Sequence, residues 1–109
     1  MANRSERAVP PPDLTRRLLI DGRVQGVGFR WALSAEATAL GLKGWVRNRR
    51  NGSVEALIHG APDAVDALTV WAWHGPSSAR VDRVLSNDEP GAAAEFAEMT
   101  GGFRQRPTF

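Results

Sequence analysis

Two segments with helical periodicity, separated by a hairpin signal, constrain the fold of this chain more than any other feature. In residues 29–40, apolar side chains recur every three or four positions, which is typical of one face of an amphipathic helix. A second such segment, residues 62–73, begins at a proline, which suits a first helical turn. Between them, the dipeptide Asn51-Gly52 predicts a tight turn that joins two antiparallel strands.

Short apolar segments flank the two predicted helices and complete the expected order of elements. The predicted strands are residues 16–24, 43–49, 53–60 and 79–85. The order is therefore β-α-β-β-α-β, the split β-α-β or ferredoxin-like arrangement. We expect an α+β sandwich with two helices on one face of a four- to five-stranded, mostly antiparallel sheet. Residues 103–106 are a candidate fifth strand, and the pattern leaves the structure of residues 92–100 open.

The chain has 109 residues, the length of one domain. Its first thirteen residues are polar and include three consecutive prolines, which join neither a helix nor a central strand. We therefore expect a flexible, proline-rich tail at residues 1–13 and a single domain at residues 14–109. The sequence contains no apolar leader, no cysteine and no apolar run long enough to span a membrane, so we expect a cytoplasmic protein.

The composition excludes several kinds of active site. Without cysteine there is no thiolate nucleophile, iron–sulfur cluster or cysteine-ligated zinc. His59 and His74 have no partner at metal-ligand spacing, and no serine lies in the context of a nucleophile elbow, so we expect no metal and no cofactor. The net charge of +2 favours anionic ligands without itself indicating nucleic acid.

A loop with two glycines connects the first predicted strand to the first predicted helix. Gly26 and Gly28 let the backbone approach a ligand closely, and the first N–H groups of the helix have no partner within it. Such a terminus binds phosphate readily, although the same glycines also suit a plain tight turn. Arg30 favours phosphate, because a cation in the first helical turn opposes the helix dipole unless an anion binds there. The alternative is that Arg30 pairs with a surface carboxylate, Glu36 or Asp21.

Asn48 lies near the end of the first hairpin strand, where asparagine is disfavoured. Its amide can both donate and accept hydrogen bonds, which suits a residue that holds a water molecule in a fixed direction. The alternative is a turn residue that opens the hairpin. We interpret the neighbouring Arg47, Arg49 and Arg50 as a solvated hairpin tip that adds positive field.

Four short segments together resemble the acylphosphatase family. They are VQGVGFR at residues 24–30, GWVRN at residues 44–48, NGSVE at residues 51–55 and GPSSARV at residues 75–81. The resemblance covers about residues 16–86, and the combination of the first two motifs is highly specific. It implies a ferredoxin-like acylphosphatase, which hydrolyses the carboxyl–phosphate bond of acyl phosphates to carboxylate and phosphate without a metal.

The resemblance also implies roles for individual residues. Arg30 matches the family's phosphate-binding arginine and Asn48 matches the asparagine that orients the attacking water, so both are expected to be catalytic. The residues that match the phosphate-binding loop are Gln25, Gly26, Val27, Gly28, Phe29 and Arg30. The chemistry is consistent, because the leaving carboxylate has a conjugate-acid pKa of about 4 and needs no general acid.

Two positions depart from the family pattern. The family commonly ends in an aromatic–x–aliphatic strand, but here Gln105 stands at the aliphatic position after Phe103, which leaves the placement of the last strand open. Asn48 is followed by Arg49, where some members carry a hydroxyl residue that supports the asparagine.

Two other classes of function fit parts of the sequence. The same motifs occur in acylphosphatase-like domains of larger carbamoyl-transferring proteins, so a non-catalytic module that binds phosphate or acyl phosphate is the alternative to an enzyme. Ferredoxin-like sheets can also stack bases on aromatic side chains, but the predicted strands lack an interleaved aromatic and basic pattern. We therefore expect a monomer whose partner is a small-molecule acyl phosphate, with no nucleic acid and no membrane.

Overall fold

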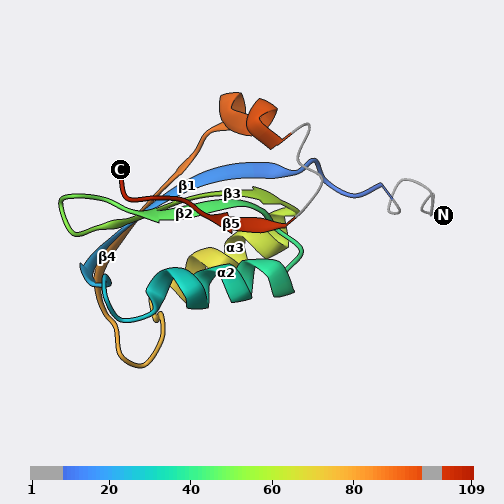
Figure 1. Ribbon diagram of the computed structural model, residues 1–109. Helices are drawn as coiled ribbons and strands as arrows, with labels where there is room; N and C mark the ends of the chain where they lie inside the picture. Colours follow the sequence, from blue (N-terminus) through green and yellow to red (C-terminus); the bar gives the residue numbers. More distant parts are fainter. Residues whose placement is uncertain (1–8, 97–101) are drawn as a thin grey trace.

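Five strands form one sheet, and two helices cover one of its faces (Figure 1). The computed structural model describes residues 9–96 and 102–109. In chain order the elements are β1 Leu14–Arg23, α2 Phe29–Ala39, β2 Lys43–Asn48, β3 Val54–Gly60, α3 Pro62–Ala72, β4 Arg80–Asp88, the 3-10 helix η1 Pro90–Phe96 and β5 Phe103–Gln105. The predicted order of strands and helices is confirmed, and no bound shifts by more than three residues.

The strand order across the sheet is β4-β1-β3-β2-β5. β1 lies between β3 and β4 and is antiparallel to both, and β2 is antiparallel to β3. β5 lies at the edge beside β2 and runs parallel to it. The predicted α+β, ferredoxin-like arrangement is thus confirmed, with the fifth strand present.

The core lies between the sheet and the two helices. Because side chains alternate along a strand, Leu18 and Ile20 of β1 point to the helices and are fully buried, as are Ala56 and Ile58 of β3. The residues that the helices bury are Phe29, Leu33 and Ala37 from α2 and Val65, Leu68 and Ala72 from α3. Each helix has eleven residues, and no helix in the described part of the chain is long and apolar enough to cross a membrane.

The other face of the sheet carries η1, in the segment whose structure the sequence left open. Phe96 of η1 covers Trp45 and Leu57, and its ring stacks on His59 with centroids 5.2 Å apart. The remainder of that segment, residues 97–100, lies outside the described residues. β4 is longer than predicted, since its pairing with β1 continues as far as Asp88.

β5 is short, but the residues after it continue along β2. The N–H of Arg106 donates to the carbonyl of Val46 at 2.8 Å, and the N–H of Phe109 donates to the carbonyl of Asn48 at 3.0 Å. Gln105, two residues after the partly buried Phe103, therefore lies on the helix side of the sheet at its edge.

At the start of the chain, residues 9–13 of the expected tail form neither helix nor strand, and residues 1–8 lie outside the described ranges. β1 begins immediately afterwards, at Leu14.

Candidate active site

The loop between β1 and α2 adopts a conformation that requires its two glycines. Gly26 has φ 72° and Gly28 has φ 79°, both in the left-handed region that side chains rarely adopt. Gly28 is the N-cap of α2, and in the described structure neither a side-chain cap nor an acidic residue in the first turn neutralises that end. The N–H groups at the start of α2 therefore lack intrahelical partners and favour an anion.

Two separate segments hold this loop in place. The Gln25 side chain donates from Nε2 to the carbonyls of Arg49, at 2.7 Å, and Ser53, at 2.9 Å, and so ties the loop to the β2–β3 hairpin. The Ser78 hydroxyl donates to the carbonyl of Val27 at 2.9 Å. The third motif, GPSSARV, thus supports the loop from outside, and the loop shape does not depend on a bound ligand.

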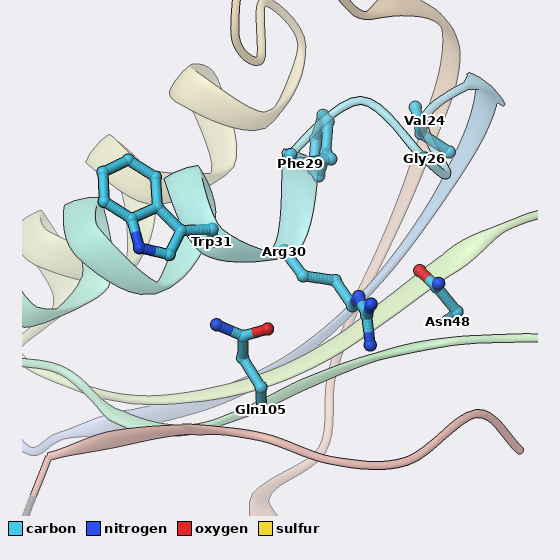
Figure 2. Close-up of a pocket in the computed structure, with 8 residues that line it drawn as sticks. Val24, Gly26, Phe29, Arg30, Trp31, Asn48 and Gln105 are labelled. Atoms are coloured by element: carbon cyan, nitrogen blue, oxygen red, sulfur yellow. The ribbon is translucent and has the colours of Figure 1, made fainter.

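Arg30 extends from the first turn of α2 into a small cavity (Figure 2). Within the described residues no carboxylate forms an ion pair with its guanidinium. Asp21, one of the two partners considered from the sequence, instead pairs with Arg83 at 3.1 Å. The guanidinium therefore remains available for an anion beside the N–H groups of α2.

Asn48 is the last residue of β2, and its side chain lies in the same cavity as Arg30 (Figure 2). Its Oδ1 atom is buried and has no hydrogen-bond donor in the described structure. The turn is instead closed by Asn51, whose Oδ1 accepts from the N–H of Ser53 at 3.0 Å. Opening the hairpin therefore does not explain the Asn48 side chain, whereas a missing donor is what a bound water molecule would supply.

The cavity has a volume of about 130 Å³. Since a water molecule occupies about 30 Å³ in the liquid, this space fits a group of a few heavy atoms, such as a phosphoryl group with an adjacent water. The lining residues are Val24, Gly26, Gly28, Phe29, Arg30, Trp31, Asn48 and Gln105. In the part of the chain that is described, no cluster of His, Asp and Glu side chains could hold a metal ion.

The cavity includes most, but not all, of the residues expected from the sequence. Gln25 and Val27 do not line it, and they contribute to the loop through the bonds described above. Three lining residues, Val24, Trp31 and Gln105, are not among the predicted site residues. Trp31 does not lie on the apolar face of α2, and a large aromatic residue at such a position can be recognised in the sequence as a candidate for ligand contact. Gln105, in contrast, reaches the cavity only because β5 pairs in parallel with β2.

The interpretation of Arg47, Arg49 and Arg50 as a solvated tip holds for Arg50, which is exposed in the turn, but is wrong for Arg47 and Arg49. They alternate with Asn48 along the chain and so lie on the opposite face of the sheet, where both bond to Glu55, at 2.7 and 3.4 Å. Burial would raise the pKa of Glu55, but hydrogen bonds from Arg47 and Arg17 outweigh it and hold the pKa of this carboxyl below its ordinary value. These arginines neutralise a buried acid rather than adding positive field to the cavity.

Comparisons with known proteins find relatives along most of the chain. The family model described as Acylphosphatase matches residues 16–98. An acylphosphatase of Thermococcus kodakarensis is 61% identical over 84 residues, which are 77% of this chain and 92% of that protein. The structure of an acylphosphatase from Coxiella burnetii matches with a TM-score of 0.76 and 34% identity, over 87% of this chain and 94% of that chain.

A much larger protein shares the fold. The crystal structure of T. kodakarensis HypF matches with a TM-score of 0.68 and 24% identity, over 85% of this chain and 12% of that chain. At that identity the match shows a common fold alone. The family model and the 61%-identical relative both extend over the loop, Arg30 and Asn48, and on their strength this chain belongs to the acylphosphatase family.

Proposed function

We propose that this protein hydrolyses acyl phosphates to a carboxylate and inorganic phosphate without a metal ion. One observation carries most of the weight: Arg30, the uncapped start of α2 and Asn48, whose Oδ1 has no donor in the described structure, line one cavity. Membership of the acylphosphatase family supports the same activity.

In this proposal the phosphoryl group of the substrate occupies the cavity. Backbone N–H groups of residues 25–30 donate to its oxygens, and the planar guanidinium of Arg30 donates two parallel hydrogen bonds. Gln25 and Val27 take part through their N–H groups only, because the Gln25 side chain and the Val27 carbonyl are already engaged. These donors are fixed before the substrate arrives, so they stabilise developing charge without reorganising.

Asn48 positions the nucleophile. Its Oδ1 accepts a hydrogen bond from a water molecule and directs that water at phosphorus, in line with the bond that breaks. The water oxygen bonds to phosphorus, the phosphorus–oxygen bond to the acyl group breaks, and the carboxylate leaves with the electron pair. The proton of the water passes to the phosphate.

A single chain is the proposed catalytic unit. Arg30 and Asn48 of one chain share one cavity, so the reaction needs no residue from a second subunit. We extend the proposal to a cytoplasmic monomer with one domain, residues 14–109, after a proline-rich tail, because β1 begins at Leu14.

The decisive experiment measures hydrolysis of acetyl phosphate by the whole chain with a metal chelator present. The wild type should turn over, and Arg30→Ala should lose at least about 100-fold in kcat, the usual effect of removing one preorganised donor. Arg30→Lys should recover little, because a point charge does not replace a two-pronged donor.

The matched control is Arg83→Ala, which removes an exposed arginine paired with Asp21 and should leave turnover unchanged. Undiminished turnover by a folded Arg30→Ala variant would refute the proposed role of Arg30. Phosphate binding by the wild type without turnover would instead indicate a non-catalytic module.

A further inference from the structure

A second space, a shallow groove open to solvent, lies between α2 and β5 beside the cavity around Arg30. The two spaces share Trp31 and Gln105 in their walls, so they adjoin each other at these two residues. The groove has a volume of about 480 Å³. Its lining residues are Trp31, Ser34, Ala35, Thr38, Ala39 and Gln105.

The groove is uncharged and mainly apolar. An indole ring, two alanine methyl groups and the Thr38 methyl group form most of its wall. The hydroxyls of Ser34 and Thr38 are already engaged, since each donates to the helix carbonyl four residues earlier at 2.8 Å. The polar groups that the groove can offer to a ligand are therefore the amide of Gln105 and the indole N–H of Trp31. Such a surface suits an uncharged, flat or apolar group.

Trp31 itself has no partner that explains its position. Its side chain is 71% exposed, although the indole ring is among the largest apolar surfaces a residue can offer. It follows Arg30 directly, its ring points away from the Arg30 guanidinium (Figure 2), and it lines the groove. A ligand group lying against the ring would cover apolar area that is now in water.

The groove lies where the leaving group of the proposed reaction must go. In Figure 2, Asn48 lies on one side of the Arg30 guanidinium, and Gln105 and Trp31 lie on the other. In an in-line displacement the water and the leaving group are on opposite sides of phosphorus. Water held by Asn48 therefore directs the acyl group toward Gln105, Trp31 and the groove beyond them.

We propose that the groove between α2 and β5 is an acyl-binding subsite that makes this enzyme prefer acyl phosphates with a flat, aromatic acyl group, with Trp31 as the main specificity-determining residue. This role depends on the proposed hydrolysis. Gln105, at a position where the family commonly has an aliphatic residue, forms the polar edge of the subsite next to the reacting oxygen atoms.

The test compares kcat/KM for benzoyl phosphate and acetyl phosphate, because the two share the reacting group and differ in the acyl part alone. Trp31→Ala should lower the ratio of kcat/KM for benzoyl phosphate to kcat/KM for acetyl phosphate about 5- to 10-fold, in keeping with a lost aromatic contact. Trp31→Phe should restore most of the preference. Inhibition by inorganic phosphate should be unchanged in both variants, which separates loss of the subsite from damage to the cavity.

The control is Trp73→Ala, which removes another exposed indole, 48% exposed at the end of α3 and outside both spaces. It should leave both substrates unaffected. Equal losses for the two substrates in Trp31→Ala, or no loss for either, would overturn the acyl subsite while leaving the hydrolase intact. A wild type that cleaves neither substrate would instead overturn the proposed function.

Discussion

At the scale of single residues, Asn48 is a polar residue whose side-chain oxygen the fold buries without a hydrogen-bond donor in the described structure. A buried acceptor without a donor costs about 1–3 kcal/mol, and the Oδ1 of Asn48 is such an atom in the described structure. Its backbone carbonyl, in contrast, has a partner, since it accepts from the N–H of Phe109. The side chain therefore contributes little to folding and is free to hold water.

Replacing Asn48 should lower the activity of the enzyme but leave its stability nearly unchanged. We expect Asn48→Ala to lower kcat for acetyl phosphate about 100-fold, because the water loses its fixed direction. The inhibition constant of inorganic phosphate should change less than about 2-fold, since Arg30 and the loop remain. Urea unfolding should show no loss of stability beyond about 1 kcal/mol.

An exposed asparagine of β4 provides the comparison, because Asn87→Ala should alter none of these quantities. A proportional loss of phosphate binding in Asn48→Ala would show that Asn48 binds the phosphate and does not position water.

At the scale of elements, the two faces of the sheet differ, because the candidate site lies on one and a cluster of ion pairs lies on the other. The helix side carries Asn48 and Gln105, whereas the other side carries Glu55, buried beneath Arg17, Arg47 and Arg49. The Arg47 guanidinium also stacks on Trp45 and Phe109, 4.6 and 4.0 Å from the ring centroids. Because side chains alternate along a strand, β2 contributes Asn48 to the cavity on one face and Arg47 to the ion pairs on the other.

The ion-pair cluster should stabilise the fold without affecting catalysis. Glu55→Gln leaves partly buried arginines without their charge partner, and it should lower the free energy of unfolding by about 2 kcal/mol, less than for a fully buried pair because the arginines retain some contact with water. The measurement is urea unfolding. Asp66→Asn, which removes the mostly exposed partner of Arg16, should cost less than about 1 kcal/mol.

Turnover of acetyl phosphate at saturating substrate should be the same in folded Glu55→Gln and the wild type. A large fall in kcat with little fall in stability would show that the opposite face of the sheet takes part in catalysis.

The helices and strands could be predicted from the sequence because the apolar periodicity and the turn residues indicated the same order of elements. The helical periodicity predicted the buried residues of α2 and α3, and Asn51-Gly52 predicted the β2–β3 turn. Arg47 and Arg49 were misread, although strict alternation with Asn48 already assigns them to the other face. The contribution of Gln105 to the cavity could not be predicted from the sequence. A parallel strand of three residues has no recognisable pattern of its own, and its position depends on pairing with β2.

At the scale of the whole molecule, pairs of arginine and carboxylate link residues that lie far apart along the chain. Hydrogen bonds from Arg16 of β1 lower the pKa of Asp88, the last residue of the neighbouring strand β4. Hydrogen bonds from Arg17 of β1 lower the pKa of Glu89, the residue that follows β4. Together with Glu55, these groups bind protons more weakly in the folded protein than in the unfolded chain.

Acid should therefore destabilise the protein. A carboxyl whose pKa is lower in the folded state adds stability above its unfolded pKa, about 4, and this stability is lost as the pH falls through the folded value. We expect the free energy of unfolding to be nearly level from about pH 7 to 5.5 and to fall below about pH 5. Urea unfolding at several pH values measures this, and Glu55→Gln should show a shallower fall. If the free energy of unfolding fell equally steeply with pH in Glu55→Gln and in the wild type, carboxyls other than Glu55 would be responsible for the sensitivity to acid.

The phosphate loop is held by partners that lie far along the chain. Gln25 bonds to the β2–β3 hairpin, Ser78 supports the loop from beyond α3, and the last strand adds Gln105 to the cavity wall. During synthesis on the ribosome, the segment with Arg30 emerges long before these supports do. The wall of the cavity is therefore complete only after β5 has been synthesised and has paired with β2.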